Sequence, residues 1–460
     1  MLRSCCVYGT GILCVLLLIA GIAMALTHVF QKLINKTIKE QIVLENGTEA
    51  FSVFQNPPPP VYMQFYFFNL TNPAEVLNGD KPFVLQVGPY TYREYRPKEE
   101  VKFLDNGTRV QAVNPKTYVF EPNMSRGSED DIIRTVNIPA VTVMEKTKDQ
   151  WFEGLVSALM KSIGVGVFGT FRVGDLLWGY EDPLLKLIQK FITMDDHFGL
   201  FIIKMATNDG DYIFFTGKQN YQDFARIDKW NGNSTLSWWS TEGCNRINGT
   251  DGASFHPYES DVSVRGVSGF RFVPPSEVFA NVTINPDNAG FCVPAGNCLG
   301  SALLNVSVCK DGAPIIMSSP HFYQADDRFV QDVFGMNPNK EEHETVVDIN
   351  PVSLNKPDEK GRFFQSRNPL CRTSSAPRIT QTGKIRTLVF PVMYLNESVL
   401  IDEESAKKLY AVVTEANVII NIPFIVISVG ILLGIIFIVL MCRQQTSPST
   451  EAERQPLLSS

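Results

Sequence analysis

Two long apolar runs stand near the ends of the chain and enclose a region of shorter, mixed pattern. Residues 7–26 and 422–441 contain no charged side chain, and each run is long enough to cross about 30 Å of hydrocarbon as a helix. We expect transmembrane helices over residues 7–28 and 418–442, with tails at 1–6 and 443–460. Ala23 and Ala25 also resemble a signal-peptidase site, but the run exceeds the roughly 7–15 residues of a signal peptide's apolar region, which favours a retained anchor.

The region between the anchors, residues 29–417, reads mainly as β-structure. Its β-branched and aromatic segments are bounded by Gly, Asn, Asp and Pro, as strands between turns usually are. The clearest are VYMQFYFFNL (61–70), GDYIFFTG (210–217), SGFRFV (268–273) and IRTLVFPVMYL (385–395). The pattern predicts a mainly antiparallel β-domain.

One interval, about residues 130–192, has the period of amphipathic helices instead. Thr147 and Gln150 stand at capping-box spacing, and an apolar face follows at Trp151, Phe152, Leu155, Val156, Leu159 and Met160. Asp182 and Pro183 predict the start of a second helix. Such a bundle either packs against the β-domain alone or also receives a partner.

Asn-x-Ser/Thr sequons distinguish the sides of the membrane. They all fall between the two apolar runs, which predicts a lumenal middle and two cytosolic tails. Asn35 lies too near the expected bilayer for us to predict its use. We expect glycosylation at Asn46, Asn69, Asn106, Asn123, Asn233, Asn248, Asn281, Asn305 and Asn396.

The C-terminal sequence ERQPLLSS contains Glu453 and the leucine pair Leu457 and Leu458. In a flexible cytosolic tail, two leucines can fill an apolar pocket of an adaptor while the acid meets a basic patch. We therefore predict an acidic dileucine sorting signal.

Composition and motifs exclude several classes of function. The formal net charge of −7 does not favour a nucleic acid partner. The chain contains no nucleophile elbow, Walker A loop, zinc-protease helix or dinucleotide fingerprint. Five histidines and the cysteine spacing do not suggest a metal centre, and Asp195, Asp196 and His197 read as a solvated loop. We expect no enzyme, no cofactor and no metal site.

The nine cysteines form two groups. Cys5, Cys6, Cys14 and Cys442 lie in or beside the apolar runs. Of these, Cys5, Cys6 and Cys442 lie at the expected cytosolic edge, where palmitoylation and an unmodified thiol are both open. The lumenal group is odd in number, so at least one thiol is free or pairs with another molecule. It comprises Cys244, Cys292, Cys298, Cys309 and Cys371.

Long motifs resemble the class B scavenger receptors over nearly the whole chain, and the dileucine tail fits their lysosomal branch. They are PPPPVYMQFYFFNLTNPAEVLNG, VGPYTYREYR, TNDGDYIFFTG, WNGNSTLSWW, CNRINGTDGASFHP, DNAGFCVPAGNCLGSALLNVSVCKDGAPIIMSSPHFYQAD and IRTLVFPVMYLNES. The resemblance implies an antiparallel β-barrel-like lumenal domain with an apolar tunnel, capped by a small helical bundle and anchored by two transmembrane helices. It also implies a disulfide between Cys292 and Cys298.

The same resemblance implies a function. It suggests a lysosomal membrane glycoprotein, reached through the endoplasmic reticulum and endosomes, that carries β-glucocerebrosidase and binds lipids such as cholesterol and phospholipids. Partner-binding helices fall on residues 149–163 and the segment after them. Clathrin adaptor complexes would bind the C-terminal tail, and a homo-oligomer stays open.

Three departures from the family pattern matter. Gln150 stands where the lysosomal relative has a histidine, and glutamine does not titrate. The chain is about twenty residues shorter between Pro257 and Gly269, which removes strand material and the cysteine expected to pair with Cys309. The stretch around Cys371 matches poorly. The alternative class is a subunit of a two-helix ligand-gated channel, for which Asn421 and Ser428 offer few polar pore-lining groups.

Overall fold

The computed structural model divides the chain into two compact units. One unit joins Met1–Glu40 with Lys407–Ser460, and the other, called here the central unit, is Gln41–Ala406. The structure describes residues 2–30, 32–33, 36, 43–57, 60–148, 150–189, 191–192, 194–202, 207–248, 257–310, 312–349, 362–369, 372–373, 382–399 and 403–445.

The terminal unit contains two long helices, α1 (Leu2–Thr27) and α11 (Glu403–Gln445). By length and composition, Val7–Thr27 and Val418–Arg443 could each cross a membrane. With 21 residues in the first of them and a rise of 1.5 Å per residue, even the shorter segment spans about 31 Å. Both apolar runs of the sequence therefore form continuous helices.

Glycines let the two helices approach closely. A Cβ added at Gly21 of α1 would lie 2.6 Å from Ile427 Cγ1 and 3.1 Å from the carbonyl oxygen of Pro423. On α11, a Cβ at Gly430 would lie 3.0 Å from the side chain of Leu18. Small residues of this kind are typical of helix packing in membranes, where close van der Waals contact replaces the hydrophobic effect.

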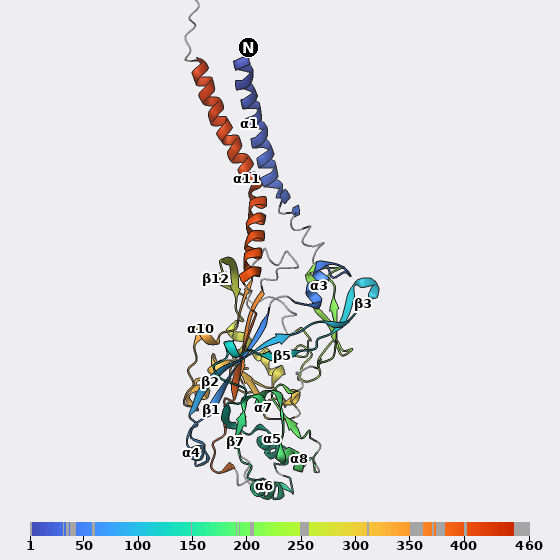
Figure 1. Cartoon of the computed structure of the whole chain (residues 1–460), viewed down its shortest axis with the longest axis vertical. Helices are drawn as coiled ribbons and strands as arrows, with labels where there is room; N and C mark the ends of the chain where they lie inside the picture. The colour runs from blue at the N-terminus through green and yellow to red at the C-terminus, as the bar shows by residue number, and fades with distance from the viewer. Residues whose placement is uncertain are drawn as a thin grey trace, which may run out of the picture. The chain divides into compact units, whose positions relative to one another are not determined.

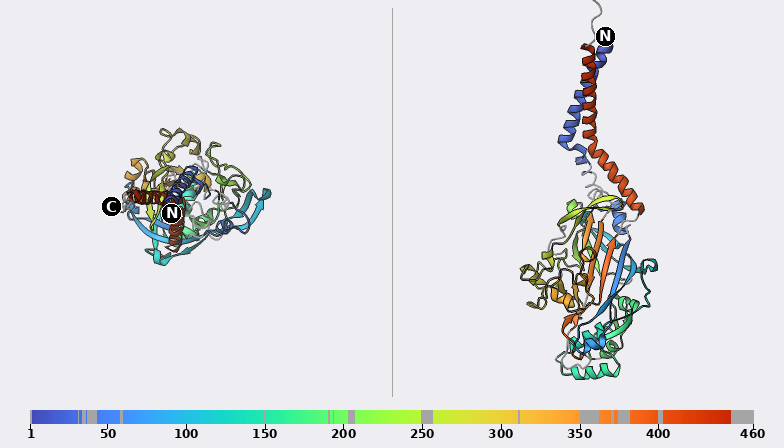
Figure 2. Two further views of the ribbon diagram at one scale, coloured as in Figure 1. Left: turned by 90° about the horizontal axis from the view of Figure 1, so that it is seen from above. Right: turned by 90° about the vertical axis from the view of Figure 1, so that its left-hand side faces the viewer.

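The main feature of the central unit is an eight-stranded antiparallel sheet in the order β12-β13-β16-β17-β20-β1-β2-β5. Its long strands lie side by side in the right-hand view of Figure 2. The strands are β1 (Val61–Leu70), β2 (Val84–Tyr95), β5 (Thr117–Phe120), β12 (Tyr258–Val264), β13 (Val267–Phe272), β16 (Val346–Ile349), β17 (Arg362–Pro369) and β20 (Met393–Val399).

The described strands do not close into a barrel, because β12 and β5 stand at opposite ends of the strand order. The expected mainly antiparallel domain is present, but the structure does not confirm a closed barrel or a tunnel. In the shortened region, β12 and β13 form a hairpin across Arg265 and Gly266, with φ angles of 51° and 83°. Positive φ at both positions suits a tight two-residue turn.

Strand β1 shows why the sequence pattern predicts the sheet well. Its alternate residues are buried as expected for a strand with one face on the core. A register shift between Phe65 and Phe67 against β2 then brings Phe67 and Phe68 both to zero exposure. The predicted segment 385–395 is instead split into β19 (Leu388–Val389) and β20 around Pro391, since proline cannot donate to a strand ladder.

A second, four-stranded sheet has the order β11-β10-β4-β3. It packs with α3 (Glu49–Gln55) around a smaller core that contains Leu44, Phe54 and Phe214. Its strands are β3 (Glu99–Leu104), β4 (Arg109–Val113), β10 (Asp211–Phe215) and β11 (Ile227–Trp230). Two-stranded pairs join β6 (Ile132–Val136) with β7 (Phe168–Arg172), β8 (Tyr180–Glu181) with β9 (His197–Phe198), β14 (Leu303–Asn305) with β15 (Ile316–Ser318), and β18 (Arg372–Thr373) with β19.

Four helices form a bundle at one end of the central unit, with α6 at the tip (Figure 1). These helices are α5 (Ile138–Thr147), α6 (Glu153–Ser162), α7 (Val173–Trp178) and α8 (Pro183–Ile188). The predicted start of α8 is confirmed, since Asp182 accepts hydrogen bonds from the backbone N–H groups of Leu184 and Leu185 at 2.9 and 3.0 Å. Shorter helices occur at α4 (Pro73–Leu77), α9 (Asp327–Gln331) and α10 (Lys340–His343).

The predicted helix start at Thr147 is wrong. Thr147 ends α5, where its buried hydroxyl donates to the carbonyl oxygen of Val143 at 2.8 Å. The backbone of Lys148 then leaves the helical region, and α6 begins at Glu153 with Phe152 as its N-cap. The threonine hydroxyl is used within the preceding helix, so it does not cap a new one.

We expect Gly21→Leu to separate α1 from α11, because a side chain there would meet Ile427. A second substitution, Gly434→Cys, allows the separation of the two helices to be measured by disulfide cross-linking. A Cβ at Gly434 would lie 3.1 Å from Cys14 Sγ, within disulfide reach. Mild oxidation of the full-length protein in membranes should link Cys14 to the introduced cysteine, as detected by mass spectrometry of the joined peptides. Gly21→Leu should lower the yield several-fold.

Gly9→Leu is the matched control, because a Cβ at Gly9 would meet nothing within 4 Å. Equal cross-linking in the two leucine variants would contradict close packing at Gly21.

Candidate functional site

An exposed apolar surface lies at the tip of the helical bundle. We call Trp151 and Leu155 the tip surface; Trp151 is 91% exposed and Leu155 is 55% exposed. Leu155 lies in the first turn of α6, and Trp151 lies in the turn just before the helix. Val156 and Met160, four residues apart on α6, anchor the helix in the core at 1% and 0% exposure. Part of the predicted apolar face therefore holds α6 in place, and part of it faces solvent.

Two further residues of the predicted apolar face lie between its exposed and its buried residues. Phe152 and Leu159 are half-buried and pack against the main core. The Trp151 ring packs edge-on against Phe152, with ring centroids 5.4 Å apart. Phe152 thus contacts the Trp151 ring, while most of the Trp151 side chain remains exposed to solvent.

Gln150 lies in the turn before α6, not on the helix as predicted. Its backbone N–H donates to the carbonyl oxygen of Thr147, and its own carbonyl oxygen accepts from the N–H of Glu153. Gln150, Trp151 and Phe152 therefore all precede α6. The residue remains exposed and next to the tip surface.

None of the sequon asparagines Asn46, Asn69, Asn106, Asn123, Asn233, Asn248, Asn281, Asn305 and Asn396 is buried. No sequon occurs between Asn123 and Asn233, an interval that contains the whole helical bundle. Glycosylation of these residues stays a prediction. If these asparagines are glycosylated, the segment that carries the tip surface still contains no N-glycan.

The structure joins Cys292 and Cys298 in a disulfide. Cys244 is a buried free thiol, and burial raises the pKa of the half-buried Cys309 thiol. Cys371 lies outside the described residues, as do Asn35 and the predicted sorting residues Glu453, Leu457 and Leu458.

The loop at Asp195, Asp196 and His197 is solvated, as predicted. His197 Nδ1 lies 2.7 Å from Asp196 Oδ1, and the side chain of Asp195 is 82% exposed. Among the described residues, this is the only group of three side chains close enough together to hold a metal ion.

Sequence analysis missed a stacked pair of buried histidines. His321 on the 3-10 helix η8 (Pro320–Phe322) and His343 on α10 are 6% and 3% exposed, with ring centroids 4.5 Å apart. The rings of Phe68 and Tyr394 pack edge-on against His321 at 5.1 and 5.6 Å. The two residues are distant in sequence and lack a ligand-like spacing, so only the tertiary fold reveals the pair.

Each of the two histidines accepts a hydrogen bond from a backbone N–H group at Nδ1. The backbone N–H of Asn337 donates to His321 Nδ1 at 3.1 Å, and that of Asn339 donates to His343 Nδ1 at 2.9 Å. His321 Nε2, which therefore carries the proton, lies 2.6 Å from Gln86 Oε1. A proton added at either Nδ1 would break the bond to that nitrogen.

Burial, followed by the neighbouring His343, lowers the pKa of His321 from 6.5 to about 4. Glu342 Oε2 lies 3.9 Å from His343 Nε2, and the Glu342 side chain is 73% exposed.

Two candidate membrane spans and a mostly antiparallel central unit with a helical tip are typical of a two-pass membrane protein with one large folded region between its spans. The sequence pattern of the CD36 family matches residues 12–261 and 257–441, and the chain belongs to that family. The two matches meet at 257–261, where the chain is expected to be shortened. Members of the family are receptors rather than enzymes.

Named relatives agree with this assignment. Lysosome membrane protein 2 of Homo sapiens is 47% identical over 480 residues, covering 99% of this chain and 99% of that protein. The Mus musculus protein of the same name is 45% identical over 483 residues, again covering 99% of each chain. Scavenger receptor class B member 1 of Cricetulus griseus is 32% identical over 466 residues, covering 95% and 89%. These relatives indicate a lysosomal, two-pass membrane protein of scavenger-receptor type.

We expect acid to destabilise the central unit through His321. Because the pKa of His321 is lower in the folded state, the unfolded chain binds the proton first as the pH falls. The contribution of neutral His321 to the free energy of unfolding is fully present above about pH 7 and is lost as the pH falls from 6.5 to about 4. A difference between pKa values of 6.5 and about 4 corresponds to about 3 kcal/mol of unfolding free energy.

Denaturant unfolding at pH 7, 5.5 and 4.5 measures this loss. His321→Gln should flatten the pH dependence over that range, although it should be less stable at pH 7. His197→Gln, at an exposed histidine, should retain the slope of the unchanged chain. An unchanged slope in His321→Gln would show that another group is responsible.

Proposed function

We propose that this chain is a trafficking receptor for the lysosomal hydrolase β-glucocerebrosidase and that it binds lipids such as cholesterol and phospholipids. The observation that carries the receptor role is the tip surface, where Trp151 is 91% exposed. Tryptophan is among the residue types most enriched at the energetic centres of protein interfaces. A tryptophan held almost entirely in water is therefore well suited to bind a partner.

The anchoring of α6 supports this role. Val156 and Met160 fix the helix to the main core, so docking at Trp151 would require little ordering of the receptor. Pre-organisation of this kind reduces the entropic cost of association. The sequon-free interval supports it further, because a glycan beside the tip surface would obstruct a protein partner.

The proposed topology places the central unit in the lumen and both tails in the cytosol. It rests on the confinement of all sequons to the region between the spans. In that topology Glu453, Leu457 and Leu458 face the cytosol and would bind clathrin adaptor complexes. The lipid-binding role rests on the scavenger-receptor relatives. An oligomer of the chain is compatible with these roles but is not needed for them.

Trp151→Ala should weaken β-glucocerebrosidase binding at neutral pH by about 30-fold or more, which corresponds to at least about 2 kcal/mol for a central aromatic anchor. Folding should be unaffected, because the Trp151 side chain is almost fully exposed. Surface plasmon resonance with immobilised full-length receptor measures the affinity.

Phe279→Ala provides the control, since Phe279 is another exposed aromatic residue (47%) of the central unit. Equal affinities of the Trp151 and Phe279 variants would remove the tip surface from the binding site. Absence of binding by the unchanged chain would remove the receptor role.

Replacing both Leu457 and Leu458 by alanine should move the protein from lysosomes to the cell surface, because the adaptor loses its apolar anchor. Surface biotinylation and microscopy measure the redistribution. A double alanine variant at Ser459 and Ser460 in the same tail is the control. Lysosomal localisation of the leucine variant at the control level would be incompatible with the signal.

A further inference from the structure

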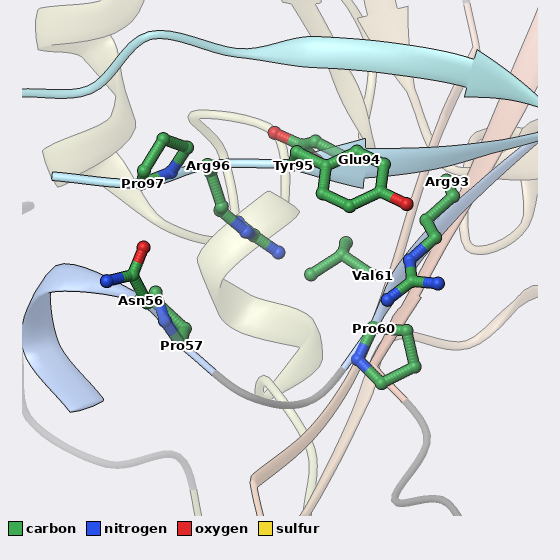
Figure 3. Close-up of a pocket in the computed structure, with 9 residues that line it drawn as sticks. All are labelled: Asn56, Pro57, Pro60, Val61, Arg93, Glu94, Tyr95, Arg96 and Pro97. Carbon is green, nitrogen blue, oxygen red and sulfur yellow. The ribbon is translucent and has the colours of Figure 1, made fainter. Parts of the chain in front are cut away.

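A cavity of about 240 Å³ lies at the end of β2, where the segment before β1 packs against it. In Figure 3, the guanidinium group of Arg96 lies in the middle of the lining residues, and that of Arg93 lies beside Pro60. Pro57 and Pro60 stiffen the facing edge, since proline fixes its own φ angle. The cavity is lined by Asn56, Pro57, Pro60, Val61, Arg93, Glu94, Tyr95, Arg96 and Pro97.

With the part of the chain that the structure describes, the two arginines use few of their hydrogen-bond donors. Arg93 lies over the Tyr95 ring at 4.9 Å and has no ion-pair partner among the residues that the structure describes. Arg96 donates to Glu397 Oε1 at 3.1 Å. A guanidinium group has five N–H donors in a planar fork, so one bond to Glu397 leaves most of the Arg96 donors available.

The lining of this cavity contains two arginines and one glutamate, and Glu397 offsets part of the positive charge through its ion pair with Arg96. Burial, followed by the charges of Arg96 and Lys116, lowers the pKa of Lys98 to about 8, despite the opposing effects of Asp209 and Glu94. Glu94 is the acidic residue of the lining and is only 6% exposed. An anion in the cavity would relieve the repulsion among these cations.

We propose that this cavity binds the phosphate group of an anionic ligand, either a phospholipid headgroup or a soluble phosphate ester. Arginine forks match phosphate oxygens in bidentate geometry. The volume is below the roughly 300–1,000 Å³ of pockets that bury a whole drug-sized ligand, so the cavity accommodates a headgroup and not an acyl chain. The phospholipid alternative deepens the lipid-binding part of the proposed function.

The cavity lies at the opposite end of the sheet from the helical bundle. Its Val61 pairs with Val399, the last residue of β20. At the other end of β1, Asn69 Oδ1 accepts a hydrogen bond from the backbone N–H of Arg134, on the strand that leads into α5. A phosphate ligand and a protein bound at the tip surface would therefore not compete for space.

The test uses purified full-length protein in detergent, with inorganic phosphate and glycerophosphocholine as probes. Arg93→Gln and Arg96→Gln should each weaken binding at least tenfold in isothermal titration. Arg96→Lys should lose part of the affinity, because it keeps the charge but not the fork. Arg126→Gln, at an exposed arginine outside the cavity, should bind like the unchanged chain. Arg93→Gln breaks no ion pair with a residue that the structure describes, and a thermal unfolding curve of the variant checks whether loss of the contact with the Tyr95 ring changes stability.

The two probes separate the two sources of phosphate. Tighter binding of glycerophosphocholine supports a phospholipid headgroup, whereas equal or tighter binding of inorganic phosphate supports a soluble phosphate compound. Equal affinity of Arg93→Gln and the unchanged chain for both probes would overturn the proposal, as would the absence of binding by either probe.

Lipid extraction from the same preparation distinguishes this failure from a failure of the proposed function. Phospholipid that co-purifies with a chain binding neither probe would overturn the cavity assignment while supporting lipid binding elsewhere. Absence of both would overturn the lipid-binding role as well.

Discussion

The antiparallel pairing of β1 with β20 is the constraint on which the rest of the central unit depends. Val61 at the start of β1 faces Val399 at the end of β20, so the chain enters and leaves the sheet at the same end. The buried aromatic residues Phe65, Phe67 and Phe68 stabilise it, because they fix β1 between its two neighbours with no exposed surface. The opposite end of the sheet is then left for the helical bundle.

The sequence predicted the parts of the fold that local chemistry determines. Apolar length predicted both spans, alternation predicted β1, and Asp182 before Pro183 predicted the start of α8. The prediction of a helix start at Thr147 was wrong, because the spacing suits an N-cap but the Thr147 hydroxyl donates to the carbonyl oxygen of Val143 in the preceding helix. The open sheet, the histidine pair and the arginine cavity could not be predicted, because each depends on contacts between segments far apart in the chain.

The apolar pattern at the start of α6 is divided between buried and exposed side chains. Val156 and Met160 supply the fully buried contacts that stabilise α6, and Phe152 and Leu159 add half-buried ones. Trp151 and Leu155 remain in water. No sequon occurs in this interval, which also leaves the tip surface open to a protein partner. Recognition by a protein explains both features with one cause, whereas packing within the domain explains only the buried side.

The candidate sites differ in their response to acid, and this difference follows from their chemistry. Arg93 and Arg96 stay charged throughout the physiological range, and a phosphodiester keeps its negative charge across it. Lys98, with a pKa of about 8, gains its full charge as the pH falls below neutral. Phosphate binding should thus persist or strengthen in an acidic compartment. His321 acts oppositely, since protonation of its ring breaks the hydrogen bond from the backbone N–H of Asn337 within the core. A chain that passes from neutral to acidic surroundings would keep its anionic ligand while the segment around η8 and α10 loosens.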